Sequence, residues 1–165
     1  MAYRFRPPIE IGVPYSKQYV KHLLDEGFYG SKFLCDAIVN KDANTVQLLM
    51  ELGVDPNIAV DKYSPLFLAL LYKSQNSAEI LLTHGVNPNQ LVPATDLRDH
   101  ISGQTLLMKV ASWKDVRMVR LLLNAGARTD LRNSSNQTAL DVAKLAQDNE
   151  EVIQLLSTIK QGENR

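Results

Sequence analysis

Three glycines recur at nearly regular intervals in this chain, and each one follows a run of leucines. Gly53, Gly85 and Gly126 come directly after residues 48–52, 80–84 and 121–125, and each of these segments contains three leucine or isoleucine residues. The first two glycines are 32 residues apart and the next two are 41 apart, which is about one 33-residue period plus eight inserted residues. Such a period predicts a stack of similar helical units, because one unit cannot bury its apolar face alone.

Within one period, the cap residues predict two short antiparallel helices followed by an extended return segment, which we call a finger. Ser64 is the expected N-cap of a first helix, with Pro65 at its first helical position. Ser74 or a neighbour should cap the second helix, which ends at Gly85. Caps are expected at the same phase in the other units, at Asp42, Asp115 and Asp148. We therefore expect about nine helices, no substantial sheet, and equivalent deep burial of Leu49, Leu82 and Leu122.

The motifs at both ends of the unit resemble the ankyrin repeat over residues 30–160. The Thr-Pro-Leu-His-x-Ala opening of that family is matched in degraded form at residues 32–37, 64–69, 105–110 and 138–143. Its Val-x-x-Leu-Leu-x-x-Gly-Ala-Asp-x-Asn ending is matched at residues 46–57, 78–89 and 119–130. The resemblance implies an all-α, ankyrin-type helix-turn-helix solenoid with short extended fingers.

The expected organisation is a single stack of four repeats with a cap at its N-terminal end. The predicted repeats cover residues 30–62, 63–103, 104–136 and 137–160. An amphipathic segment within residues 15–29 is expected to form a capping helix, and residues 1–14 and 161–165 are expected to be tails. The family histidine that links neighbouring repeats is replaced by Cys35, Phe67, Met108 and Asp141. Cohesion between repeats should therefore depend more on apolar packing.

The charge balance argues against partners that need a strongly charged protein. Lys plus Arg and Asp plus Glu both number 18, so the net charge is zero, which does not favour sequence-independent nucleic-acid binding. A modest basic patch on the convex face keeps nucleic-acid binding as an alternative, through Arg117, Arg120, Arg128 and Arg132. No apolar run has the roughly 18 residues that a membrane helix needs, so we expect no membrane insertion.

Candidate catalytic and metal-binding residues are few. Cys35 is the single cysteine, which excludes an internal disulfide and a Cys-based zinc site, and it falls at a buried helical phase. His22 and His84 are expected to have structural or solvated roles. Asp96 and His100 mark one acid-plus-histidine loop, which is the alternative site for an enzyme or a metal. We predict no catalytic residues, no metal and no cofactor.

The resemblance also indicates where a partner would bind. In the family the variable contact positions lie on the concave face, and here they include aromatic residues, which are enriched at binding hot spots. The candidate contact residues are Asn40, Tyr63, Leu71, Tyr72, Gln104, Ser112 and Trp113, and Leu97 and Arg98 in the finger of residues 90–102, which carries the eight extra residues. This finger is either a binding element or a structural flap.

The sequence therefore predicts a protein-interaction module that has no catalysis of its own. It should bind a partner protein through its concave face and fingers, and should be monomeric alone. An adaptor, an inhibitor, a complex subunit and a secreted bacterial effector remain open as roles. A cytoplasmic location is expected, or the host cytoplasm for a translocated effector, because the single cysteine shows no need of an oxidising compartment.

Overall fold

The protein is a stack of helix pairs joined by fingers. The computed structural model describes residues 17–25, 30–93 and 102–162, and within these ranges all regular secondary structure is helical. The helices are α1 (Lys17–Asp25), α2 (Gly30–Val39), α3 (Ala43–Glu51), α4 (Pro65–Leu71), α5 (Gln75–Thr83), α6 (Leu106–Ser112), α7 (Val116–Asn124), α8 (Ala139–Leu145) and α9 (Glu150–Gly162). The all-α solenoid and the helix count predicted from the sequence are confirmed for the described residues.

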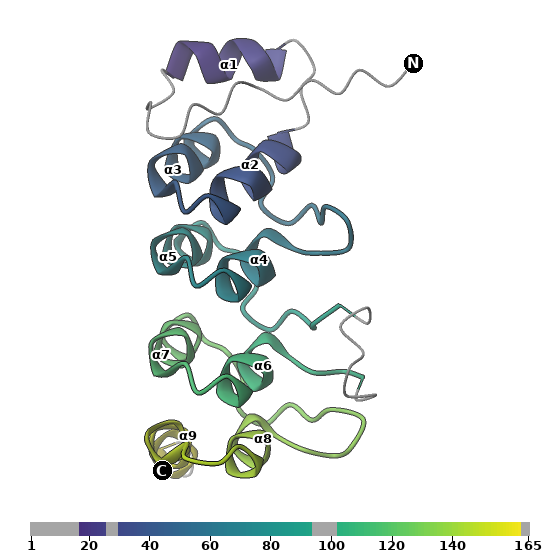
Figure 1. Ribbon diagram of the computed structural model, residues 1–165, viewed down its shortest axis with the longest axis vertical. Coiled ribbons are helices and arrows are strands. Elements are labelled where there is room, and N and C mark those ends of the chain that lie inside the picture. Colours follow the sequence, from purple (N-terminus) through teal and green to yellow (C-terminus); the bar gives the residue numbers. More distant parts are fainter. Residues whose placement is uncertain (1–16, 26–29, 94–101, 163–165) are drawn as a thin grey trace.

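Two parallel columns of helices make up the stack (Figure 1). One column contains the first helices of the pairs, α2, α4, α6 and α8, and the other contains the second helices, α3, α5, α7 and α9. The fingers project from the first column to one side. Helix α1 lies at the N-terminal end of the stack, where the buried side chain of Val20 joins the core.

Most of the predicted helix boundaries follow from side-chain caps. Ser64 accepts a hydrogen bond from Phe67 N at the start of α4, and Pro65 is the first residue of that helix. Asp42 and Asp115 cap α3 and α7 in the same way. These caps use side-chain oxygens to satisfy amide groups that have no acceptor within the helix.

The expected cap at Asp148 is wrong. Helix α9 begins at Glu150, and Asp148 lies two residues earlier in the left-handed region with φ 50°. The last unit has one additional residue between its two helices, and this residue shifts Asp148 out of the capping position. Asn149 instead holds the turn, because its side-chain Nδ2 donates to the carbonyls of Ala111 and Ala143, each at 3.0 Å.

The core is a continuous apolar layer between the two columns. Leu49 and Leu122 are completely buried, as predicted. The prediction is wrong for Leu82, which is half-buried, whereas its neighbour Leu81 is completely buried. Leu49, Leu81 and Leu122 each precede their closing glycine by four residues, so the glycine phase identifies the buried leucine correctly.

Three of the residues that replace the family histidine belong to the apolar core. Cys35, Phe67 and Met108 are all buried, in agreement with the expectation for these positions. In the fourth unit Asp141 instead accepts hydrogen bonds from the N–H and hydroxyl of Thr138, at 2.9 and 2.8 Å. That unit therefore uses the position for a cap at the start of α8.

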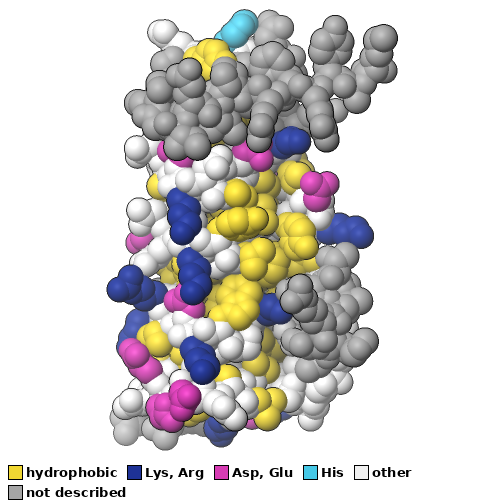
Figure 2. Space-filling view, viewed as in Figure 1, with side chains coloured by type: hydrophobic (Ala, Val, Ile, Leu, Met, Phe, Trp, Pro, Cys, Tyr) yellow, Lys and Arg dark blue, Asp and Glu magenta, His cyan; other side chains and the backbone are white. Residues whose placement is uncertain are grey.

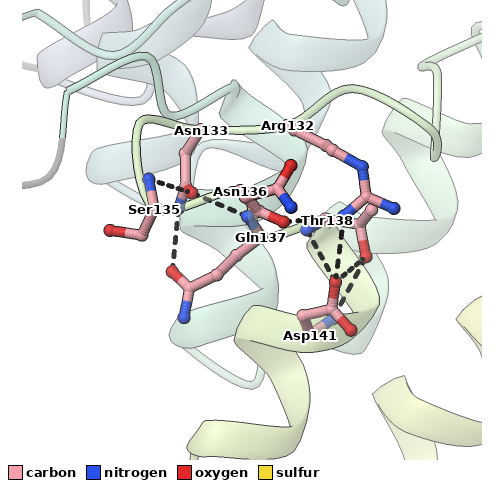
Figure 3. Close-up of polar contacts among 7 residues, drawn as sticks. All are labelled: Arg132, Asn133, Ser135, Asn136, Gln137, Thr138 and Asp141. Carbon is pink, nitrogen blue, oxygen red and sulfur yellow. Dashed lines mark hydrogen bonds and ion pairs between the residues drawn. The ribbon is translucent and has the colours of Figure 1, made fainter.

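The fingers contain little backbone pairing but are held by side chains. Isolated bridges join Val60 to Tyr63 and Leu91 to Thr105. In the finger before α8, the buried Asn133 accepts hydrogen bonds from the amides of Ser135 and Gln137 at 3.0 and 2.9 Å (Figure 3). Its amide group also donates to Gln137 Oε1 at 3.0 Å. A single asparagine therefore organises this finger.

Candidate protein-interaction surface

The predicted contact residues of the first helices lie at equivalent places in the stack. Leu71 is the last residue of α4 and Tyr72 is its C-cap, while Ser112 and Trp113 take these positions in α6. The amides of Tyr72 and Trp113 donate to Leu68 O and Lys109 O, so both helices end in the same way. We call the surface formed by these helix ends and the turns that follow them the turn face.

Apolar side chains are exposed on the turn face. Leu71 and Tyr72 are 42% and 43% exposed, and Leu145, at the same position in α8, is 71% exposed. Figure 2 shows a hydrophobic area in the middle of this face, over the column of first helices. Adjacent exposed apolar residues of this kind are typical of sites that bind another molecule.

Trp113 is less exposed than Tyr72. It is half-buried and packs against the core, and the Nζ of Lys109 lies 6.0 Å from the centroid of its ring. At that distance the cation is attracted to the face of the ring. Trp113 therefore combines a packing role with a partly accessible side chain.

The predicted contact residues on the fingers also have structural partners. Tyr63 is half-buried and stacks on Phe67, with ring centroids 5.6 Å apart and an angle of 13° between the planes. Gln104 is half-buried, and its carbonyl accepts a hydrogen bond from Val92 N at 2.8 Å. Both residues border the first-helix column and leave part of their surface accessible.

The remaining predicted contacts are Asn40, Leu97 and Arg98. Asn40 is exposed and follows the last residue of α2, so it lies on the turn face. Leu97 and Arg98 lie outside the described residues, as does the whole Asp96–His100 loop. Leu145 was not among the predicted contacts, although it takes the equivalent position at the end of α8 and is 71% exposed.

The arginines of the proposed basic patch are largely engaged in ion pairs. Arg128 contacts Asp130 at 2.6 Å, and Arg120 and Arg132 each lie 4.0 Å from a carboxylate oxygen, of Glu151 and Asp141 respectively. Arg132 also donates to the carbonyl of Asn136 at 2.6 Å. These partners offset the positive charge that binding to phosphate groups requires.

The environments of Cys35 and His84 favour structural roles for these side chains over chemical reactivity. Burial, together with the negative charges of Asp36 and Asp61, raises the pKa of the Cys35 thiol to about 11, so the thiolate is disfavoured. His84 donates from Nδ1 to the carbonyl of Ile80 at 2.8 Å, which confirms its structural role. Among the described residues, no group of three or more His, Cys, Asp or Glu side chains could hold a metal ion.

Comparison with known protein families agrees with the repeat pattern. A family model described as ankyrin repeats (3 copies) matches residues 15–92, and a model described as ankyrin repeat matches residues 102–134. Together they cover more than half of the chain. The chain belongs to the ankyrin repeat family. A search of curated proteins found no match.

Membership in the ankyrin repeat family indicates the general function. Ankyrin repeats are protein–protein interaction modules, and this chain is such a module. Within its described residues, no helix is long and apolar enough to cross a membrane.

Proposed function

We propose that this ankyrin module binds one partner protein across the turn face and the adjoining finger residues, and that it performs no catalysis itself. The contact residues would be Asn40, Tyr63, Leu71, Tyr72, Gln104, Ser112 and Trp113. The single observation that supports this surface most is the exposure of Leu71 and Tyr72 at the end of α4. Apolar side chains exposed side by side gain free energy when a partner removes them from water.

Tyr72 and Trp113 are proposed as the main anchors. Both residues end a first helix, and large aromatic side chains lose little conformational entropy when a partner immobilises them. Trp113 is already held by Lys109 and by the core, so it loses still less. The proposed role is that of an adaptor, an inhibitor, a complex subunit or a delivered effector, acting in the cytoplasm as a monomer until its partner binds.

The test is affinity purification with the full chain from its native cells, followed by identification of the retained protein. Replacing both anchors, in the Tyr72→Ala/Trp113→Ala variant, should weaken binding of that protein by about 2 kcal/mol or more, which is roughly a 30-fold change. Tyr19→Ala is the matched control, because Tyr19 is also an exposed tyrosine, 37% accessible, but lies on α1. Unchanged affinity in a folded double variant would move the binding site away from the turn face.

A further inference from the structure

The turns between paired helices carry a lysine at the same position in three successive repeats. Lys41, Lys73 and Lys114 each follow the first helix of a pair, and their amides donate to Ile38 O, Leu70 O and Ala111 O at 3.0 to 3.2 Å. All three side chains are exposed. The shared hydrogen bond shows that the three lysines are structurally equivalent.

Each of these lysines adopts a backbone conformation that favours glycine. Their φ angles are 58°, 53° and 60°, in the left-handed region where a side chain is disfavoured. The second helices of the same repeats end in that region with glycine, at Gly53, Gly85 and Gly126. The protein therefore keeps a lysine at three sites where glycine would be less strained, and strain of this kind is concentrated at functional positions.

The three lysines form a column of positive charge along the turn face. Packed helices are about 8–10 Å apart, so equivalent residues of successive repeats recur at about that distance. Figure 2 shows basic side chains in a line along this face, beside the hydrophobic area. None of the three lysines is in an ion pair with another described residue.

The acidic residues that follow the lysines form no ion pair with this column. Asp42 and Asp115 follow two of the lysines, but their carboxylates accept hydrogen bonds from Thr45 and Met118 as helix caps. In the fourth unit the left-handed position is occupied by Asp148, with φ 50°. The positive column therefore ends after the third repeat, where the charge changes sign.

We infer that the lysine column, which we define as Lys41, Lys73 and Lys114, binds an acidic segment of the partner protein that also carries apolar side chains. This inference rests on the proposed function and specifies the chemistry of the partner. Carboxylates about 10 Å apart would match the lysines, and an α-helix provides this spacing between residues i, i+7 and i+14 at 1.5 Å per residue. The apolar side chains of that segment would lie on Leu71, Tyr72 and the accessible part of Trp113, next to the lysines in the chain.

A protein segment fits this surface better than a nucleic acid does. Lysines in a line also attract phosphates, but the chain has no net charge. Exposed Leu71 beside the column is aliphatic and offers no face on which a base could stack, whereas the neighbouring Tyr72 does offer one. A single-stranded RNA oligonucleotide is nevertheless a useful competitor, because it separates the two classes of partner.

The test begins with selection of binders from a display library of random peptides about 16 residues long, a length that spans three repeats as a helix. The full chain is the target. We expect the selected peptides to be rich in Asp and Glu together with apolar residues, and to bind more weakly at high salt. Their affinity is then measured for the K41G/K73G/K114G variant.

Glycine is the informative replacement because it removes the charge and suits the left-handed backbone, so this variant should melt no lower than the original protein. Lys62→Gly is the matched control, since Lys62 is also exposed, with φ 74°, but lies on a finger. The triple variant should bind the selected peptides about tenfold more weakly or worse, and the control should bind them normally.

Three results would overturn the inference. If the selected peptides no longer bind the Tyr72→Ala/Trp113→Ala variant but still bind the lysine variant, the proposed surface stands and the column is excluded. Lysine-dependent binding of RNA without acidic peptides would assign the column to a nucleic acid. Failure to select acidic peptides would also reject the column, while the affinity purification above tests the proposed function separately.

Discussion

The most decisive test of the fold compares two adjacent leucines of α5. Leu81 is completely buried in the core, whereas Leu82 is half-buried at its edge. Leu81→Ala removes side-chain atoms from a site where the neighbours can relax only in part, so it should lower the free energy of unfolding by about 2–5 kcal/mol. Leu82→Ala should cost only about 1 kcal/mol, since roughly half of the transfer free energy of a leucine is involved.

Urea unfolding followed by circular dichroism measures both values, and thermal unfolding provides a second measure. A loss of about 3 kcal/mol in a chain of this size lowers the melting temperature by roughly 6–12 °C. The urea dependence, or m-value, must be the same in the two variants, because a solenoid can lose part of its stack locally and then expose less surface on unfolding. Equal losses, or a larger loss for Leu82→Ala, would refute the assignment of Leu81 to the buried position.

Two further predictions concern single residues at helix ends. Gly126→Ala should destabilise the protein by about 1–2 kcal/mol in urea unfolding, because at φ 85° the added Cβ crowds its own backbone, while no other described part of the protein lies within 4 Å of it. An unchanged stability would contradict this. For Asp141, the hydrogen bonds from the Thr138 backbone and hydroxyl lower the pKa of the carboxyl, and Arg132 and Lys144 add to this shift. The contribution of the ionised Asp141 carboxyl to the free energy of unfolding is therefore complete above the unfolded-state pKa of about 3.9 and is lost as pH falls through the lower folded-state pKa. The stability difference between the original protein and Asp141→Asn should shrink in acid. A difference that does not depend on pH would show that Asp141 acts without its charge.

Local backbone features were predictable from the sequence because the residues that cause them are adjacent in the chain. Three local features each determine a helix end without any distant contact: a glycine with φ near 80°, a serine before a proline, and an aspartate that accepts a hydrogen bond from the amide three residues later. The wrong prediction at Asp148 has the same origin, since one additional residue in the last unit changed which side chain precedes the helix.

The lysine column is also present in part in the sequence. Lys41, Lys73 and Lys114 follow the first helices at one phase of the repeat, so their equivalence is present in the spacing. Their positive φ angles and the absence of ion pairs among the described residues could not be read from the sequence. Both depend on how the turns close and on what lies beside them.

The sequence by itself determined the repeat, the two helices of each unit and the family, because these depend on the period and on short-range caps. Only the tertiary structure decided which side of each helix is covered. It buried Leu81 and left Leu82 at the edge, and it exposed Tyr72 while partly covering Trp113 at an equivalent helix end. The physical reason is that burial depends on the side chains of the next repeat, 30 to 40 residues away, and their shapes differ from one interface to the next.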